Sequence, residues 1–333
     1  MGDVAMTVPV LRALMQQHPK LKVTVVSRPF FKPFFNGIPN VNFFAVDLQK
    51  RHKGFLGLLR LFSDLKKLEI DAVADLHNVL RSKVIRALFA LSGKKVAFTD
   101  KGRAEKKALT RAENKVFKPL KPMVERHVET FEKLGFPVSL KHPQFPAKVV
   151  LSEEVLKITG HKNLPWIGIA PFAQYEGKVY PLDLMQKVID ELAKNTSNKI
   201  FLFGGGNEEI RKLNQLQNNH SNVTVLAGKL KFNQELDVIS NLDVMLSMDS
   251  GNSHIAAMLG VKVITLWGAT HPFAGFSPFY QPLNNCITAD RAKFPLLPTS
   301  IYGNKKVEGY ESAMRSIPVE KIVTAIQSQL AGS

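Results

Sequence analysis

The sequence predicts an α/β protein built from two doubly wound domains in series. Short apolar segments alternate with amphipathic segments in both halves of the chain, a pattern typical of parallel strands joined by helices. The 333 residues, 45% of them apolar, suffice for two hydrophobic cores. We therefore expect one domain over residues 1–150 and a second over residues 151–333.

The first half opens with a predicted helix. Residues 4–14 form an apolar helix interrupted only by Pro9, and Asp3 lies at its N-terminus, where a carboxylate is favourable. Because doubly wound domains normally open with a strand, we expect the first strand of this domain to be missing and the given start to be too late. Further strands are expected at 22–27, 42–46, 72–75 and 94–98, and further helices at 55–68, 79–91 and 127–134.

The second half repeats the alternation after a proline-bearing linker at 141–148. The last predicted helix, 319–330, is expected to close the structure and to pack back on the first domain. Strands are expected at 166–170, 199–203, 223–226, 244–247 and 261–266, and the main intervening helices at 182–193, 207–218 and 232–242.

The positive charge of the chain is concentrated in its first half. Residues 1–150 hold 28 Lys/Arg against 12 Asp/Glu, a net charge of +16, whereas the whole chain carries +17. Such asymmetry predicts an anionic partner for the first domain: nucleic acid, an acidic membrane surface or a phosphorylated substrate. The densest stretch, 100–121, is expected to be an exposed loop or a weakly packed helix.

Several classes of protein are disfavoured by composition. Cys286 is the only cysteine, which excludes a disulfide framework and fits a reducing compartment. No apolar run is long enough for a membrane-spanning helix, and the first residues do not form a signal peptide. The histidines lack metal-ligand spacing, so neither a metal nor another cofactor is expected.

The segment from Asp243 to His271 has the strongest functional pattern. A short apolar strand leads into Asp249-Ser250-Gly251, a short helix follows, and Gly260 ends it before the next strand. The backbone N–H groups at such a helix start favour an anion, above all a phosphate. In the alternative, Asp249 or Ser250 only caps the helix and His254 packs or faces water.

Three further positions are candidates for the site. The run Gly204–Gly206 follows a strand and opens a helix, which allows close approach of a ligand, and Glu208 or Glu209 beyond it suits a ribose diol. Lys178, in a polar loop, suits a diphosphate and the charge that develops on a leaving group. Asp3 suits a general base or, equally, a helix cap. The alternatives for Lys178 and the glutamates are a solvated lysine and helix-dipole partners.

Two motifs together resemble glycosyltransferase family 9, the heptosyltransferases of lipopolysaccharide core assembly. The first is Gly2-Asp3-Val4 followed by Thr7-x-Pro9-x-Leu11-Arg12-Ala13-Leu14. The second is Asp249-Ser250-Gly251-x-x-His254-x-Ala256-Ala257-x-Leu259-Gly260, with the following Val263 to Pro272 segment. They lie in opposite halves, in the family's order, and the layout covers nearly the whole chain.

The resemblance implies a GT-B fold, two Rossmann-like domains facing a central cleft, with the acceptor on the first and the donor on the second. It implies metal-independent, inverting transfer of a heptose or related sugar from a nucleotide-sugar, usually ADP-heptose, to an inner-core acceptor. The expected partners are this donor and an anionic glycolipid, with no nucleic acid. The expected location is cytoplasmic, peripheral at the inner face of the bacterial inner membrane.

The resemblance also assigns roles to residues. Asp3 matches the general base that deprotonates the acceptor hydroxyl, and Lys178 matches a phosphate-contacting lysine. Either Glu208 or Glu209 matches the ribose-binding acid, with the register open. The diphosphate is expected to be held by the residues of the second motif: Asp249, Ser250, Gly251 and His254.

Two alternatives stay open. A sugar-nucleotide epimerase on the same fold would act on free nucleotide-sugar and would not need a basic acceptor domain. A nucleic-acid-binding protein would use the +16 half, although that half contains no recognised nucleic-acid module.

Overall fold

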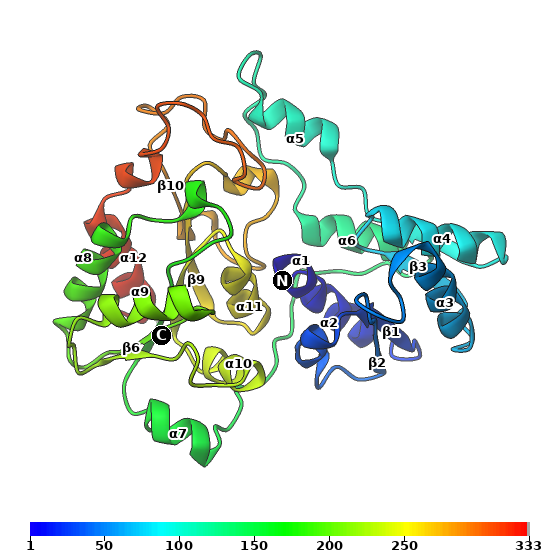
Figure 1. Cartoon of the computed structure of the whole chain (residues 1–333), viewed down its shortest axis with the longest axis horizontal. Coiled ribbons are helices and arrows are strands. Elements are labelled where there is room, and N and C mark those ends of the chain that lie inside the picture. Colours follow the sequence, from blue (N-terminus) through cyan, green and yellow to red (C-terminus); the bar gives the residue numbers. More distant parts are fainter. Residues whose placement is uncertain (332–333) are drawn as a thin grey trace. The chain divides into compact units, whose positions relative to one another are not determined.

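The computed structural model describes residues 1–331, which divide into two compact units (Figure 1). The first unit comprises Met1, Asp3–Gly102 and Lys121–Gln144. The second comprises Gly2, Arg103–Leu120 and the chain from Phe145 onward. Each unit is an α/β structure with parallel strands, as the sequence predicts.

The strands of the first unit form two separate parallel pairs. In one pair Val23 aligns with Val41, and in the other Ala72 aligns with Lys95. The expectation that a strand is missing ahead of Met1 stays a prediction. The strands are β1 (Val23–Ser27), β2 (Val41–Ala45), β3 (Ala72–Asp75) and β4 (Lys95–Phe98), and the helices are α1 (Gly2–Ala5), α2 (Thr7–Gln17), η1 (Pro29–Phe35), α3 (Gly54–Lys66), α4 (Leu80–Leu91) and α6 (Met123–Glu132).

The predicted first helix is present but divided at Met6 into α1 and α2. The Thr7 hydroxyl donates to the Val4 carbonyl across the break, at 2.7 Å. Pro9 falls in the first turn of α2, where its missing N–H leaves no helical hydrogen bond unmade. Beyond α2, the core of the unit lies between its helices and strands, where Leu58, Leu61 and Leu65 of α3 meet Phe89 of α4.

The second unit contains a fully parallel six-stranded sheet within the described residues. Its order is β10-β9-β8-β5-β6-β7, which, numbered within the unit, is 3-2-1-4-5-6 read from β7. This is the Rossmann order, and it has its topological switch point between β5 and β8. The strands are β5 (Trp166–Ala170), β6 (Lys199–Leu202), β7 (Val223–Val225), β8 (Val244–Met248), β9 (Lys262–Trp267) and β10 (Cys286–Thr288).

Helices cover this sheet, and its central strands are buried throughout. Ile322 and Ile326 of the last helix pack with Met185 and Ile189 of α8 in the core of this second unit. The helices are α7 (Glu153–Thr159), η2 (Glu176–Lys178), α8 (Leu182–Ala193), α9 (Asn207–Gln217), α10 (Phe232–Ser240), α11 (Gly251–Met258), η3 (Pro272–Ala274), η4 (Leu283–Asn285), η5 (Ala313–Ser316) and α12 (Val319–Ala331).

The charge-dense segment 103–120 is better packed than the sequence suggests. It begins with α5 (Arg103–Thr110), and its Leu109 and Leu120 join Ala274 in a small buried cluster of the second unit. The backbone N–H of Leu120 donates to the carbonyl of Phe273 at 2.9 Å. Most of its other residues are exposed and residues 111–120 form no helix or strand, so the expected exposed segment is present, with Leu109 and Leu120 as its buried anchors.

None of the helices in residues 1–331 is long and apolar enough to cross a membrane.

Candidate active site

The candidate donor site lies at the carboxyl end of the second unit's sheet, at its switch point. Lys178 belongs to η2 in the loop after β5, and Asp249 directly follows β8, the neighbouring strand. The Lys178 ammonium lies 3.0 Å from Asp249 Oδ2. The two side chains are only 13% and 9% exposed. The topology thus joins two predicted site residues that lie far apart in sequence.

A third residue completes this cluster. The Thr270 hydroxyl, in the loop after β9, donates to Asp249 Oδ2 at 2.9 Å. Asp249 therefore accepts from a cation and a hydroxyl at one oxygen, which fixes its orientation. An ammonium carries three donors, so the pair with Asp249 leaves Lys178 able to contact an added anion. Thr270 lies within the second sequence motif but was not assigned a role there, because its contact with Asp249 depends on the order of the strands.

Close backbone packing holds the loop of Lys178 in position. The backbone N–H of Ala269 donates to the Gly177 carbonyl at 2.9 Å, which joins the loops after β5 and β9. A Cβ at Gly268 would lie 2.6 Å from that same carbonyl, so only glycine fits. At Gly303, where φ is +81°, a Cβ would lie 2.4 Å from Lys178 Cδ. The lysine stem is thereby held against a bare backbone.

The start of α11 has no side-chain cap from its N-cap residue. Ser250 is its N-cap residue, but its side chain does not cap the helix and instead lies 3.1 Å from the Ser247 hydroxyl. The first N–H groups of a helix have no intrahelical partner, so those that begin at Gly251 are suited to a negative group. His254, one turn further on, is buried. The alternative that the Ser250 side chain serves as a cap is not what the structure contains.

The two candidate glutamates of α9 are oriented differently. Glu209 Oε2 accepts from the backbone N–H of Gly205 at 2.8 Å, so its carboxylate lies against the glycine-rich loop after β6. Glu208 is 75% exposed and pairs with Lys212 at 2.8 Å, one turn along the helix. That hydrogen-bonded pairing lowers the pKa of Glu208. Only Glu209 is directed toward the loop that follows a central strand.

His271, next to Thr270, lies in a cluster of aromatic and cationic side chains. Its Nδ1 accepts from the Phe273 backbone N–H at 3.1 Å, and its ring meets the Phe117 ring edge-on at 4.9 Å. The Arg291 guanidinium lies 3.5 Å from the centroid of that Phe117 ring. Burial, together with the Arg291 charge, lowers the pKa of His271 to about 4. The imidazole is therefore neutral near pH 7, with its proton on Nε2.

Replacing His271 with asparagine is expected to make the free energy of unfolding fall less steeply as the pH is lowered from 7 to 5. The pKa of this imidazole is near 6.5 in the unfolded chain and about 4 in the folded protein. Between pH 6.5 and pH 4 the unfolded chain therefore binds more protons than the folded protein does, which favours unfolding. Its contribution to stability is complete above pH 6.5 and declines as the pH falls toward 4. From pH 7 to pH 5 the wild type should lose about 2 kcal/mol more than the variant in urea-unfolding free energy.

Asparagine keeps an oxygen acceptor for the Phe273 N–H, so it serves as a matched replacement at this cap. Equal pH dependence of unfolding in the two proteins would contradict a buried, neutral His271.

The remaining predicted catalytic residue, Asp3, belongs to the first unit. It is exposed in the first turn of α1 and acts electrostatically on two neighbours. The pKa of His77 is lowered mainly by burial and by Lys101, with Asp3 acting in the opposite direction. The pKa of the Met1 amino group is likewise lowered mainly by burial, again opposed by Asp3. Asp3 thus lies close enough to His77 and to the Met1 amino group to act on both.

His77, on which Asp3 acts, was not among the predicted site residues. It follows β3, and the buried Asp75 that ends this strand accepts hydrogen bonds from the backbone N–H groups of His77 and Asn78, at 3.1 and 2.7 Å. Asp75 also pairs with Arg86 at 3.2 Å. The backbone of the exposed His77 is thereby fixed at the carboxyl end of a strand.

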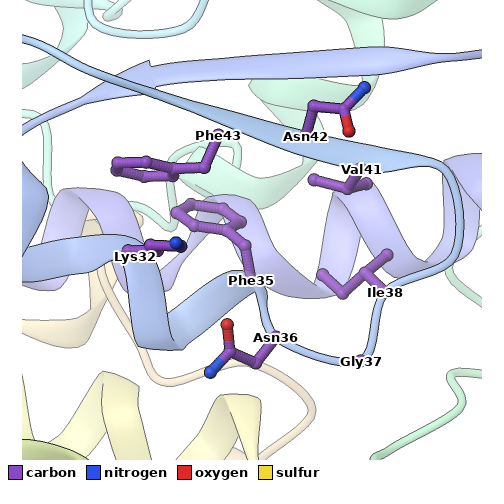
Figure 2. Close-up of a pocket in the computed structure, with 8 residues that line it drawn as sticks. All are labelled: Lys32, Phe35, Asn36, Gly37, Ile38, Val41, Asn42 and Phe43. Carbon is purple, nitrogen blue, oxygen red and sulfur yellow. The ribbon is translucent and has the colours of Figure 1, made fainter.

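A separate cavity of about 360 Å³ lies in the first unit, between η1 and the start of β2 (Figure 2). Phe35 and Phe43 stack at its centre with ring centroids 5.9 Å apart, whereas Asn36 and Asn42 point away from each other. It is lined by the amino-terminal residues of β2, whereas open α/β sheets bind ligands outside the carboxyl ends of their strands. This cavity is therefore not part of the candidate site.

Comparisons with known proteins point to one family. The family model of glycosyltransferase family 9 (heptosyltransferase) matches residues 58–300. The lipopolysaccharide core heptosyltransferase OpsX of Haemophilus influenzae is 25% identical over 297 residues, covering 86% of this chain and 81% of that protein. The glycosyltransferase family 9 structure from Veillonella parvula has a TM-score of 0.74 at 18% identity, covering 100% and 95% of the two chains. The Escherichia coli heptosyltransferase WaaC with ADP has a TM-score of 0.66 at 20% identity, covering 99% and 97%.

The fold of the chain is the GT-B fold, which the solved heptosyltransferase structures share. Because the family model matches more than half of the chain, the protein belongs to glycosyltransferase family 9, the heptosyltransferases. The resemblance stated from the two motifs is thereby confirmed. Neither an epimerase nor a nucleic-acid-binding protein is favoured by these matches.

Proposed function

We propose that this enzyme is an inverting, metal-independent heptosyltransferase that moves heptose from ADP-heptose to an inner-core sugar of lipopolysaccharide. The observation that carries the proposal is the Lys178–Asp249 pair at the switch point, beside the start of α11. The printed names of the relatives support the choice of substrates: a lipopolysaccharide core heptosyltransferase, and a heptosyltransferase with ADP.

The donor half of the reaction uses the second unit. The diphosphate of the donor lies against Lys178 and the N–H groups at Gly251, with Ser250 and His254 at its edge. When the bond from the anomeric carbon to the phosphate oxygen breaks, its electron pair stays on that oxygen. A fixed cation and a helix N-terminus stabilise this charge more in the transition state than in the donor. Asp249 and Thr270 are positioning residues, since they hold the lysine in place.

The acceptor half uses Asp3. Its carboxylate takes the proton from the acceptor hydroxyl as the hydroxyl oxygen forms a bond to the anomeric carbon. Attack from the face opposite the departing diphosphate inverts the anomeric configuration. The products are the heptosylated acceptor, protonated Asp3 and ADP, so atoms and charge balance without a metal. The net charge of +16 over residues 1–150 suits an anionic, phosphorylated glycolipid.

The proposed location is the cytoplasmic side of the inner membrane, at the surface of the bilayer that carries the acceptor. The net charge of +16 over residues 1–150 supports this location, because the cytoplasmic leaflet is anionic. Nucleic acid is not a proposed partner.

Glutamine substitution of the two α9 glutamates is expected to separate their roles. Glu209→Gln should weaken ADP binding by about 10- to 100-fold, since the loss of a charged acceptor for a ribose hydroxyl costs about 1.5–3 kcal/mol. Glu208→Gln should leave the Kd for ADP unchanged, because that side chain is exposed and paired with Lys212. Titration calorimetry with ADP distinguishes them. A larger loss of affinity from Glu208→Gln would reverse the proposed assignment.

A thermal-shift panel with ADP, UDP, GDP and their sugars tests the proposed donor. ADP and ADP-heptose are expected to raise the unfolding temperature more than the other nucleotides do. A preference for UDP or GDP would exclude ADP-heptose as donor, and no stabilisation by any nucleotide would contradict the proposed donor site.

A further inference from the structure

The outer face of α3 carries large apolar side chains where a surface helix normally carries polar ones. Phe55 and Leu56 are each 67% exposed, and Leu59, one turn further on, is 37% exposed. The opposite face of the helix packs in the core of the first unit through Leu58, Leu61 and Leu65, so the exposed residues are not needed for that packing. Exposed apolar side chains grouped in this way mark interaction surfaces. We call Phe55, Leu56 and Leu59 the α3 face; α3 lies on the outside of the first unit (Figure 1).

Basic residues surround the α3 face. Within residues 50–68, six are Lys or Arg, and Asp64 is the only acid. Asp64 is neutralised locally, since Arg51 donates to it at 2.8 and 2.9 Å and His52 Nε2 lies 3.2 Å away. These hydrogen bonds, that of Arg51 first, lower the pKa of Asp64 to about 2. The exposed cations that flank the face are Lys50, Lys53, Arg60, Lys66 and Lys67.

Hydrogen bonds hold the loop before α3 in place, and this loop positions the start of the α3 face. The Asp47 carboxylate accepts from the backbone N–H groups of Gln49 and Lys50, at 3.1 and 3.0 Å. His52 Nδ1 accepts from the backbone N–H of Asp47 at 3.0 Å. The backbone at His52 packs so closely on α3 that a Cβ at Gly57 would lie 2.3 Å from its carbonyl carbon.

We propose that the α3 face is the surface by which the enzyme docks on an anionic lipid bilayer. Apolar side chains on a basic amphipathic helix enter the boundary between headgroups and acyl chains, while Lys and Arg contact the anionic headgroups. Charge favours an anionic bilayer over a second copy of this chain, because the second copy would present the same positive charge and be repelled. A nucleic acid would use the cations but not the apolar residues. The inference rests on the proposed function only in that the acceptor is a membrane glycolipid.

Sedimentation of the full-length protein with vesicles tests the α3 face in the absence of nucleotide and acceptor. Vesicles of phosphatidylcholine with about 30% phosphatidylglycerol should bind the wild type, and vesicles without the anionic lipid should bind it at least about tenfold more weakly. Phe55→Ser/Leu56→Ser and Lys66→Glu/Lys67→Glu should each reduce binding to the anionic vesicles by about tenfold or more.

A matched control removes two exposed apolar side chains from the second unit. Val150→Ser/Leu283→Ser should bind like the wild type, and circular dichroism should be unchanged in every variant. Wild-type binding by Phe55→Ser/Leu56→Ser would overturn the inference. So would a wild-type dimer that only this variant dissociates, since the face would then join two copies.

The outcome is separable from that of the proposed function. Phe55→Ser/Leu56→Ser should retain the wild-type Kd for ADP, because the α3 face lies outside the donor site. Absent ADP binding together with vesicle binding would reject the proposed donor site and leave the docking surface standing. ADP binding without vesicle binding would do the reverse.

Discussion

Replacing Asp3 with asparagine is expected to lower the rate of heptose transfer by about 10²–10⁴-fold, the usual contribution of a general base. Asparagine has nearly the same shape as aspartate but cannot accept the acceptor's proton. The side chain is exposed in the first turn of α1, so the substitution should not disturb the fold. ADP binding should be unchanged, because the proposed donor residues belong to the second unit. Initial rates of ADP release, with saturating donor and acceptor, measure the effect.

Asp71→Asn is the matched control, since it removes another exposed carboxylate from the first unit. It should retain the wild-type rate. A transfer rate for Asp3→Asn within a few-fold of wild type would show that another group takes the proton, and His77, on which Asp3 acts, would be the next to replace.

Replacing Lys178 with alanine is expected to reduce both donor binding and the rate of transfer. The ammonium is the fixed cation of the proposed diphosphate site, and one lost contact to a developing charge costs about 10²–10³-fold in kcat. The variant also leaves Asp249, whose side chain is 9% exposed, without its cation beside the proposed diphosphate site. The Kd for ADP should therefore rise as well, which distinguishes this variant from Asp3→Asn.

Two further variants isolate the cause. Lys212→Ala removes a lysine of the same unit that pairs with the exposed Glu208, and it should be neutral in both assays. Lys178→Ala/Asp249→Asn removes the unpaired carboxylate, so it should recover part of the ADP affinity but not the rate. If Lys178→Ala changed kcat alone and left the Kd for ADP at its wild-type value, the lysine would not hold the ground-state diphosphate.

Much of the fold could be predicted because buried strands and helices have characteristic patterns of apolar residues in the local sequence. The strands at Val244–Met248 and Trp166–Ala170 are short apolar runs, as parallel strands buried on both faces must be. The break at Met6 was missed, because the apolar pattern continues across it. The burial of Leu109 and Leu120 within the otherwise exposed segment 103–120 was also missed, because the charged residues around them dominate its pattern.

The sequence indicates the part of the candidate site that lies in one turn, Asp249-Ser250-Gly251. It does not show which residues from different loops come together. The Lys178–Asp249 pair and the Thr270 hydroxyl come from three loops that only the sheet order places side by side. The choice between Glu208 and Glu209 depends on how each side chain is oriented, and the sequence left it open. In the structure the Glu209 carboxylate accepts from the Gly205 N–H, which favours Glu209 as the proposed ribose ligand.

The central claim is that this chain transfers heptose from ADP-heptose to an inner-core glycolipid, with Asp3 and Lys178 in separate roles. Mass spectrometry of the acceptor after incubation with ADP-heptose tests it most directly. The acceptor is expected to gain one heptose residue for each ADP released with the wild type, and to gain it far more slowly with Asp3→Asn or Lys178→Ala. Consumption of ADP-heptose with the acceptor left unchanged would contradict it.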